Sequence, residues 1–268
     1  MSDILEELTR ARRHDAAQCE TSIPFAEMER IANAAPEPRD FAAALRGACG
    51  AKYGQKPHII AELKRASPSE GMIREDFHPV QLAKELEAAG ATALSVLCEP
   101  HRFLGGEQYL REVRDATNLP LLYKDFVSTR YQIAAARAAG ADAVLLIAAV
   151  LDDESLAELL GYARGIGLAA LVETHDEREI ERAVAAGAGI VGVNCRNLRN
   201  FSCDVSLLER LVGSIPRPTI RVAESGMHSR DAMLRAMVAG ADAFLVGTAL
   251  MRAKRPGEKL TEFIQPTE

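Results

Sequence analysis

The sequence predicts an α/β protein whose main body is a parallel (β/α)8 barrel, preceded by a helical extension. The main observation is a junction that occurs four times, in which an Ala-rich helix ends at a glycine and an apolar strand follows at once. The four glycines are Gly90, Gly140, Gly187 and Gly240, and they lie 50, 47 and 53 residues apart. This period is too long for one βα unit and fits two, so a further strand is expected within each period.

The first element along the chain is the extension, residues 1–48, which has helical periodicity before and after a Pro-Glu-Pro break at 36–38. Its apolar positions are Ile4, Leu5, Leu8, Ile31, Phe41, Ala44 and Leu45. We expect the extension to pack on the barrel, residues 49–268, and to close one end of it. Covering a bound substrate is the alternative.

The additional strands are four apolar segments at residues 59–64, 119–124, 168–173 and 219–224. Together with the strands after the four glycines they make eight, which alternate with helices as a parallel barrel requires. Helix N-caps are expected at Ser128, at Thr174 and at Ser229. A doubly wound open sheet is the alternative, but it would need a Gly-rich turn after the first strand, where the chain has Arg-Ala-Ser-Pro.

Composition excludes several classes of protein. A chain of 268 residues with 48% hydrophobic and 26% charged residues is ordinary for a globular enzyme, and no apolar run approaches the roughly 18 residues of a membrane span. The net charge of −6 disfavours nucleic acid as the main partner. The acidic N-terminus lacks the pattern of a signal peptide, so we expect a cytoplasmic protein. The oligomeric state is not indicated.

Cysteine and histidine spacing indicates neither disulfides nor a metal site. The five cysteines are Cys19, Cys49, Cys98, Cys195 and Cys203; they form no CxxC pair and are expected to be free thiols. The six histidines show no HxH or HExxH spacing.

Charged residues gather at the predicted carboxyl ends of the strands, where barrel enzymes carry their functional groups. Because side chains alternate between the two faces of a strand, Glu62 and Lys64 share the interior face, and Lys124, Glu173 and Glu224 end other strands on that face. We expect a lysine close to another cation and away from water to have a lowered pKa, with a carboxylate as base. A salt-bridge network that merely closes the barrel is the alternative, although buried ion pairs contribute little to stability.

Glycines after the seventh and eighth strands indicate a phosphate site. Gly226 follows one strand, and Gly247 and Thr248 follow the next, at the start of a short helix. Backbone N–H groups can approach an anion closely at such positions, as in the usual phosphate site of this fold. The alternative is that these glycines only make tight turns.

The chain resembles the indole-3-glycerol-phosphate synthase family over nearly its whole length. The resemblance depends on several motifs in order, at residues 38–41 (PRDF), 61–69 (AELKRASPS), 95–97 (SVL), 124–126 (KDF), 171–173 (LVE), 193–198 (VNCRNL) and 223–226 (AESG). It implies ring closure of 1-(2-carboxyphenylamino)-1-deoxyribulose 5-phosphate to indole-3-glycerol phosphate, with loss of carbon dioxide and water, in tryptophan biosynthesis. The implied partner is this phosphorylated small molecule, and neither cofactor nor metal is expected.

The resemblance also implies roles for individual residues. Lys124 would be the general acid that activates the ketone, and Glu173 its acid/base partner in dehydration. Lys64, held by Glu62, would contact the anthranilate carboxylate or transfer a proton. The substrate would be positioned by Asn194, Arg196, Glu224 and Ser225. Its phosphate would be bound by Ser67, Gly226, Gly247 and Thr248, and its aromatic ring would lie against Phe103 and Leu198.

Cys195 departs from the family pattern, which often has a second Asn there, and strand alternation turns it away from Asn194. Two other functions are less consistent with the residues. A barrel of the phosphoribosylanthranilate isomerase type would have a Cys general base at the end of the first strand, where this chain has Lys64. A catalytically silent scaffold would have lost some of the charges at the strand ends.

Overall fold

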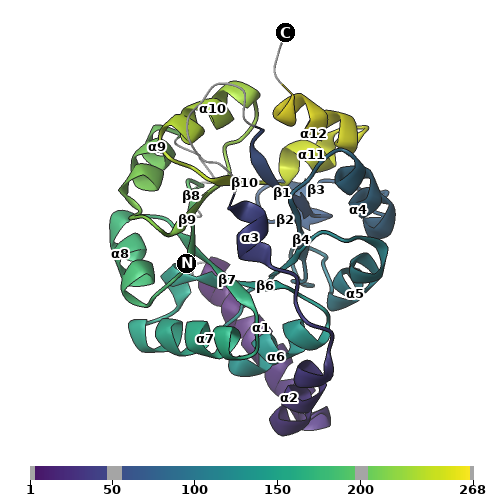
Figure 1. Ribbon diagram of the computed structural model, residues 1–268. Helices are drawn as coiled ribbons and strands as arrows, with labels where there is room; N and C mark the ends of the chain where they lie inside the picture. Colours follow the sequence, from purple (N-terminus) through teal and green to yellow (C-terminus); the bar gives the residue numbers. More distant parts are fainter. Residues whose placement is uncertain (1–3, 47–55, 197–204, 266–268) are drawn as a thin grey trace.

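The computed structural model describes residues 4–46, 56–196 and 205–265. Eight parallel strands form a closed barrel in the order β1, β10, β9, β8, β7, β6, β5, β4, which confirms the predicted (β/α)8 TIM barrel (Figure 1). The strands are β1 (His58–Leu63), β4 (Ala93–Leu97), β5 (Leu121–Lys124), β6 (Ala143–Ile147), β7 (Ala169–Thr174), β8 (Ile190–Asn194), β9 (Ile220–Glu224) and β10 (Ala243–Val246). A short antiparallel pair, β2 (Ala66–Ser67) and β3 (Gly71–Met72), follows β1 and was not expected.

Helices surround the barrel as an outer ring (Figure 1). They are α4 (Pro79–Ala88), α5 (Glu107–Ala116), α6 (Arg130–Ala138), α7 (Asp153–Gly165), α8 (Glu177–Ala185), α9 (Val205–Ser214), α10 (Arg230–Val238), α11 (Thr248–Arg252) and α12 (Pro256–Ile264), with a 3-10 turn η1 (Ala148–Val150) after β6. The four repeated glycines all have positive φ, between 83° and 111°, as a left-handed helix end requires.

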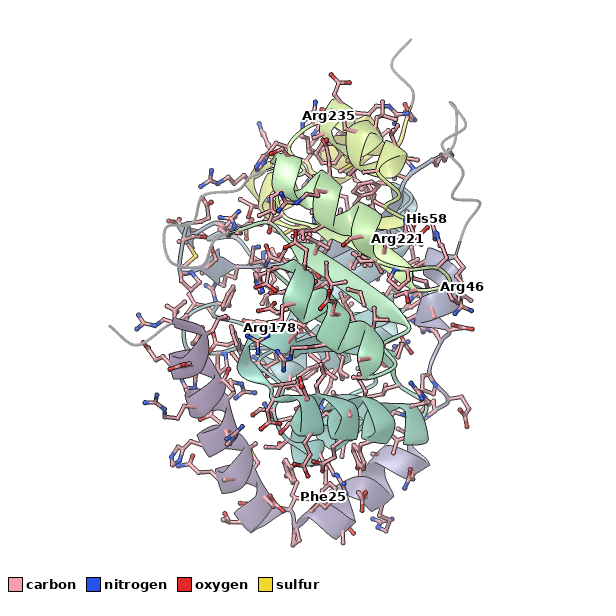
Figure 2. The ribbon with its side chains drawn as sticks, turned by 90° about the vertical axis from the view of Figure 1, so that its left-hand side faces the viewer. Phe25, Arg46, His58, Arg178, Arg221 and Arg235 are labelled. Carbon is pink, nitrogen blue, oxygen red and sulfur yellow. The ribbon has the colours of Figure 1, made fainter. Side chains whose placement is uncertain are left out.

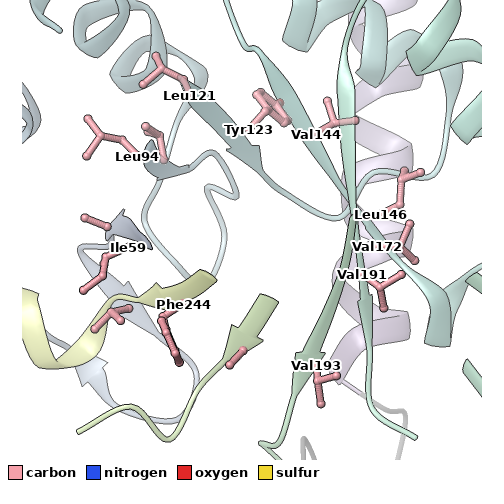
Figure 3. Packing of buried hydrophobic residues seen from close by; sticks show 14 of the residues in the cluster. Ile59, Leu94, Leu121, Tyr123, Val144, Leu146, Val172, Val191, Val193 and Phe244 are labelled. Atoms are coloured by element: carbon pink, nitrogen blue, oxygen red, sulfur yellow. The ribbon is translucent and has the colours of Figure 1, made fainter. Parts of the chain in front are cut away.

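The apolar core has two layers separated by the strands. Outward-facing residues such as Leu94, Tyr123 and Val172 pack under the helices, as Figure 3 shows. Inward-facing residues such as Leu122 and Leu171 fill the barrel interior. The two sets alternate along each strand, so the face assigned to each charged residue by alternation is the interior one.

Two helix starts differ from the prediction. Ser229 caps α10 as expected, accepting the N–H of Ala232. Helix α6 is capped by Thr129 and not by Ser128, and α8 is capped by Asp176 and not by Thr174. The Thr174 hydroxyl donates instead to the carbonyl of Gly192 on β8, because this residue still belongs to β7.

The extension contributes α1 (Ile4–Ser22), α2 (Phe25–Ala34) and α3 (Phe41–Leu45). Side chains of both α1 and α3 belong to the interior apolar cluster, while α2 packs on α6. Figure 2 shows α1 at one end of the barrel and Arg46, which follows α3, at the other. The predicted division at residue 48 falls outside the described residues, so the domain boundary stays a prediction.

The expectation of free cysteines is wrong for Cys195, which is disulfide-bonded. Sequence spacing failed here because it reports on neighbours along the chain and not on neighbours in space. Cys19 and Cys98 are free, and Cys49 and Cys203 lie outside the described residues. Among the described helices, none has the length and apolar character to cross a membrane.

Candidate active site

A pocket opens at the carboxyl ends of the strands, with a volume of about 1150 Å³ including its open mouth. It is lined by all the predicted site residues that the structure describes: Glu62, Lys64, Ser67, Phe103, Lys124, Glu173, Asn194, Arg196, Glu224, Ser225, Gly226, Gly247 and Thr248. Leu198, the other predicted wall of the site, lies outside the described residues.

Lys124, at the end of β5, lies between two buried carboxylates. Its Nζ donates to Glu173 Oε2 at 2.9 Å and lies 3.9 Å from Glu224 Oε2. Glu173 and Glu224 are 3% and 1% exposed, so these charges are almost removed from water. The three side chains come from β5, β7 and β9, whose ends the barrel brings to one edge.

The expected lowering of the lysine pKa is wrong for Lys124. Burial favours the neutral amine, but the negative charges of Glu173, Glu224 and Glu62 outweigh it and raise the pKa of Lys124. Burial also disfavours the charged form of Glu173, yet Lys124 and His175 hold its pKa well below the usual range. Burial and the negative charge of Glu173 raise the pKa of Glu224 well above it. These shifts favour the charged forms of Lys124 and Glu173 and the protonated form of Glu224.

A second pair, Glu62 and Lys64, lies on β1 and just after it. Lys64 Nζ donates to Glu62 Oε2 at 2.5 Å, and Glu62 is 3% exposed. Two of the pocket carboxylates lie against glycines, Gly247 just after β10 and Gly192 on β8. A Cβ on Gly247 would collide with Glu62 Oε2, and a Cβ on Gly192 would collide with Glu224 Oε1. Gly247 thus has a packing function besides its predicted place in a phosphate site.

Asn194, at the end of β8, connects the carboxylates to the loop after β9. Its Nδ2 donates to Glu173 Oε1 at 3.2 Å, and its Oδ1 accepts from Ser225 Oγ at 2.8 Å and from the Arg196 N–H at 3.0 Å. Ser225 has φ of 66°, an uncommon conformation for a residue other than glycine. Such conformations concentrate at functional sites, where neighbouring contacts hold them.

The predicted phosphate-binding residues Ser67, Gly226, Gly247 and Thr248 all line the pocket. Gly226 has φ of 72°, and Gly247 and Thr248 begin α11. Arg196 Nη1 donates to Ser69 Oγ at 3.2 Å and lies 3.5 Å from Glu70 Oε1. Arg196 is therefore held by the loop after β1, which also carries Ser67.

Apolar side chains also line the pocket. Phe103 packs against Phe126 with ring centroids 6.1 Å apart. Phe126 was not predicted in the site, although it follows Lys124 by two residues and the period of a strand would have placed it there. Ile4, Leu5 and Leu8 of α1 also line the pocket.

Two further buried carboxylates, Glu99 and Asp125, hold segments that border the pocket. Glu99 is fully buried and accepts the backbone N–H groups of residues 101, 102 and 103, which fixes the loop that carries Phe103. Asp125 accepts from Arg12 of α1, through Nε at 3.0 Å and Nη2 at 2.7 Å. This contact fastens α1 directly beside Lys124.

Within the described part of the chain, there is no group of three or more His, Cys, Asp or Glu side chains that could hold a metal ion.

The barrel and its charged mouth define the class of the chain, which is that of the (β/α)8-barrel enzymes. Residues 5–263 match the family model of indole-3-glycerol phosphate synthase. The chain is 43% identical over 261 residues to the indole-3-glycerol phosphate synthase of Acidithiobacillus ferrooxidans, covering 97% of this chain and 98% of the relative. It is 44% identical over 262 residues to that of Albidiferax ferrireducens, with 98% of each chain covered, and 45% identical over 251 residues to that of Campylobacter curvus, with 93% and 94% covered.

The chain therefore belongs to the indole-3-glycerol phosphate synthase family, and it is a carboxy-lyase of tryptophan biosynthesis that acts on a phosphorylated small molecule. A thiamine phosphate pyrophosphorylase from Pyrococcus furiosus superposes with a TM-score of 0.58, over 77% of this chain and 93% of the other. At 18% identity, that similarity concerns the fold alone.

Proposed function

We propose that Lys124 is the general acid of ring closure and that Glu173 is the base of the dehydration that follows. The observation that carries this proposal is the position of Lys124 Nζ, 2.9 Å from Glu173 Oε2 and 3.9 Å from Glu224 Oε2 in a buried pocket. A raised pKa suits the role of Lys124. The amine stays protonated until the ketone oxygen gains negative charge. The alkoxide that then forms is a stronger base than the amine and takes its proton.

The proton balance follows from the chemistry of the substrate. The aromatic carbon that bears the carboxylate bonds to the ketone carbon, and the oxygen takes a proton from Lys124. Carbon dioxide then leaves, and its bonding electrons restore the aromatic ring. Dehydration breaks the C–OH bond and a C–H bond on the adjacent ring carbon. The ionised Glu173 takes the carbon-bound proton, and the departing hydroxyl takes a proton from the protonated Glu224 and leaves as water. Burial favours the protonated form of Glu224 that this donation needs. Glu173 then returns a proton to Glu224, and Lys124 regains its proton from solvent.

The remaining predicted residues position the substrate in this proposal. Its phosphate lies against Ser67, Gly226, Gly247 and Thr248. Asn194, Arg196 and Ser225 orient the part of the substrate that reacts. The aromatic ring of the substrate packs on Phe103 and, by prediction, on Leu198. A substrate that carries both a phosphate and a carboxylate does not cross a bilayer unaided, which supports a cytoplasmic location.

The general acid is tested with Lys124→Ala, assayed on the carboxyphenylamino-deoxyribulose phosphate without cofactor by the fluorescence of the indole product. We expect turnover to fall about 10²- to 10⁴-fold, the usual contribution of a positioned acid. Lys84→Ala, at an exposed position on α4, is the matched control and should retain activity. Turnover near that of the unmodified enzyme would remove Lys124 from the mechanism.

Lys64 has two candidate roles, and kinetics separate them. If Lys64 only binds the substrate carboxylate, Lys64→Ala raises KM and leaves kcat nearly unchanged. If Lys64 transfers a proton, kcat and kcat/KM fall together. The pairing of Lys64 Nζ with Glu62 at 2.5 Å is compatible with both.

A further inference from the structure

His175 lies two residues after Glu173, between that carboxylate and a second one on the next helix. Its Nδ1 is 3.1 Å from Glu179 Oε2 on α8, which also accepts the His175 backbone N–H at 2.8 Å. Its Nε2 is 3.5 Å from Glu173 Oε1. The backbone N–H of His175 holds the Glu179 carboxylate, and the contact of that carboxylate with Nδ1 orients the ring so that Nε2 faces Glu173.

The His175 Nε2 atom is an unused donor at the edge of the active site. It is buried and, among the described residues, has no hydrogen-bond partner. An N–H group in such a position is costly unless a partner comes within reach. The Glu173 carboxylate is near enough that a shift of a few tenths of an ångström would make the bond.

The charges around His175 favour its protonated form. Burial lowers its pKa, but the nearby carboxylates of Glu173 and Glu179 raise it to about 10. The strands on either side of β7 end in the uncharged residues Ile147 and Asn194. Among the described residues, Glu173 and Glu179 are the charged groups that act most strongly on the ring.

Glu173 needs such a partner at one stage of the reaction. In the free enzyme its Oε2 accepts from Lys124 at 2.9 Å, and its Oε1 accepts from Asn194 at 3.2 Å. When Lys124 turns toward the ketone oxygen of the substrate, Glu173 loses its charged partner while still buried. An unpaired buried carboxylate tends to take up a proton, and it would then no longer act as a base.

We propose that His175 is a positioning residue, which Glu179 orients and which becomes the charged partner of Glu173 when Lys124 turns to the substrate. This inference depends on the proposed role of Glu173 as base. His175 itself transfers no proton and stays an imidazolium, so the proton balance of the reaction is unchanged.

The test is the pH dependence of kcat in His175→Gln. Glutamine can still donate a hydrogen bond but carries no charge, so Glu173 should take up a proton at higher pH. We expect the acidic limb of the profile to move up by about one pH unit and kcat at the optimum to fall about tenfold, the value of one charge-assisted hydrogen bond. KM should change less than about twofold, because His175 does not touch the substrate.

Glu179→Gln provides a second variant in case His175→Gln folds poorly. This variant keeps an acceptor oxygen for the ring but loses the negative charge. It should move the acidic limb of the kcat profile to higher pH, by less than His175→Gln does. Glu177→Gln is the matched control, since it removes one charge from the same turn of α8 and its partner is Arg210 on the surface. It should leave the profile unchanged.

Nitrogen NMR of histidine-labelled wild-type enzyme reads the charge directly. We expect His175 to be an imidazolium at about pH 8, where a histidine of ordinary pKa is neutral. A neutral ring at that pH, or an unmoved acidic limb in both variants, would overturn the inference. Glu173→Gln separates the two proposals: if it retains turnover, the role of Glu173 fails, and if it is inactive while His175→Gln is normal, only the role of His175 fails.

Discussion

Arg12 fastens the N-terminal helix to the barrel through a carboxylate with no exposed surface. The Asp125 side chain accepts from Arg12 Nε and Nη2, and it also accepts from the Tyr123 hydroxyl at 3.1 Å and from the Phe126 N–H at 2.8 Å. Arg12→Ala removes the cation and leaves the two neutral donors. Losing one partner of a buried ion pair costs about 3–5 kcal/mol, and because two donors remain we expect the lower end, about 3 kcal/mol.

The assay is the free energy of unfolding from urea titration, with Arg13→Ala as the matched control. Arg13 is the next residue of α1, is exposed, and makes one 3.3 Å contact with Ser128 Oγ. Its loss should change stability by less than about 0.5 kcal/mol. Arg12→Ala should also raise KM, since α1 lines the pocket. Equal stability losses in the two variants would refute the reasoning that the Asp125 contact holds the helix.

Gly192→Ala should displace the Glu224 carboxylate, lower kcat and cost about 1–3 kcal/mol of stability by overpacking. Gly189→Ala is the control, because an added Cβ meets open space there, and it should have none of these effects. Equal kinetics in the two variants would argue against the packing explanation. Thr129→Ala should lose about 0.5–2 kcal/mol of unfolding free energy, the usual value of an N-cap, and an unchanged urea midpoint would show that the cap is dispensable. The raised pKa of His175 means that the folded state binds more protons than the unfolded state between pH 6.5 and about 10, so stability should fall as pH rises through this range. That slope should be smaller in His175→Gln, as measured by urea titration at several pH values.

The positions of the charged site residues were predictable because two regular patterns determine them. Strand alternation selects the face on which Lys124, Glu173 and Glu224 lie, and a parallel barrel selects the end. The pKa of Lys124 was not predictable in the same way. Its direction depends on how many carboxylates surround the amine in space, and Lys64, the cation that was expected to lower it, is paired with Glu62.

Local errors came from elements whose partners the sequence does not specify. Ser128 and Thr174 are good capping residues, but the caps are Thr129 and Asp176, because the exact start of a helix depends on where the preceding strand or loop ends. The apolar face of α1 was visible in the sequence, but the surface that it covers was not. An apolar stripe indicates that a helix packs on something without indicating what.

The extension closes the barrel at both ends, with α1 at the mouth and α3 opposite, and this has a consequence for the order in which the protein assembles. Residues of both helices pack on the barrel interior, which is complete only when β1 has paired with β10. During synthesis the extension leaves the ribosome before the barrel strands, long before β10 exists. It is therefore made before the barrel but is among the last parts to reach its native contacts, and protection of Phe41 and Leu45 from solvent reports that the whole barrel has been made and closed.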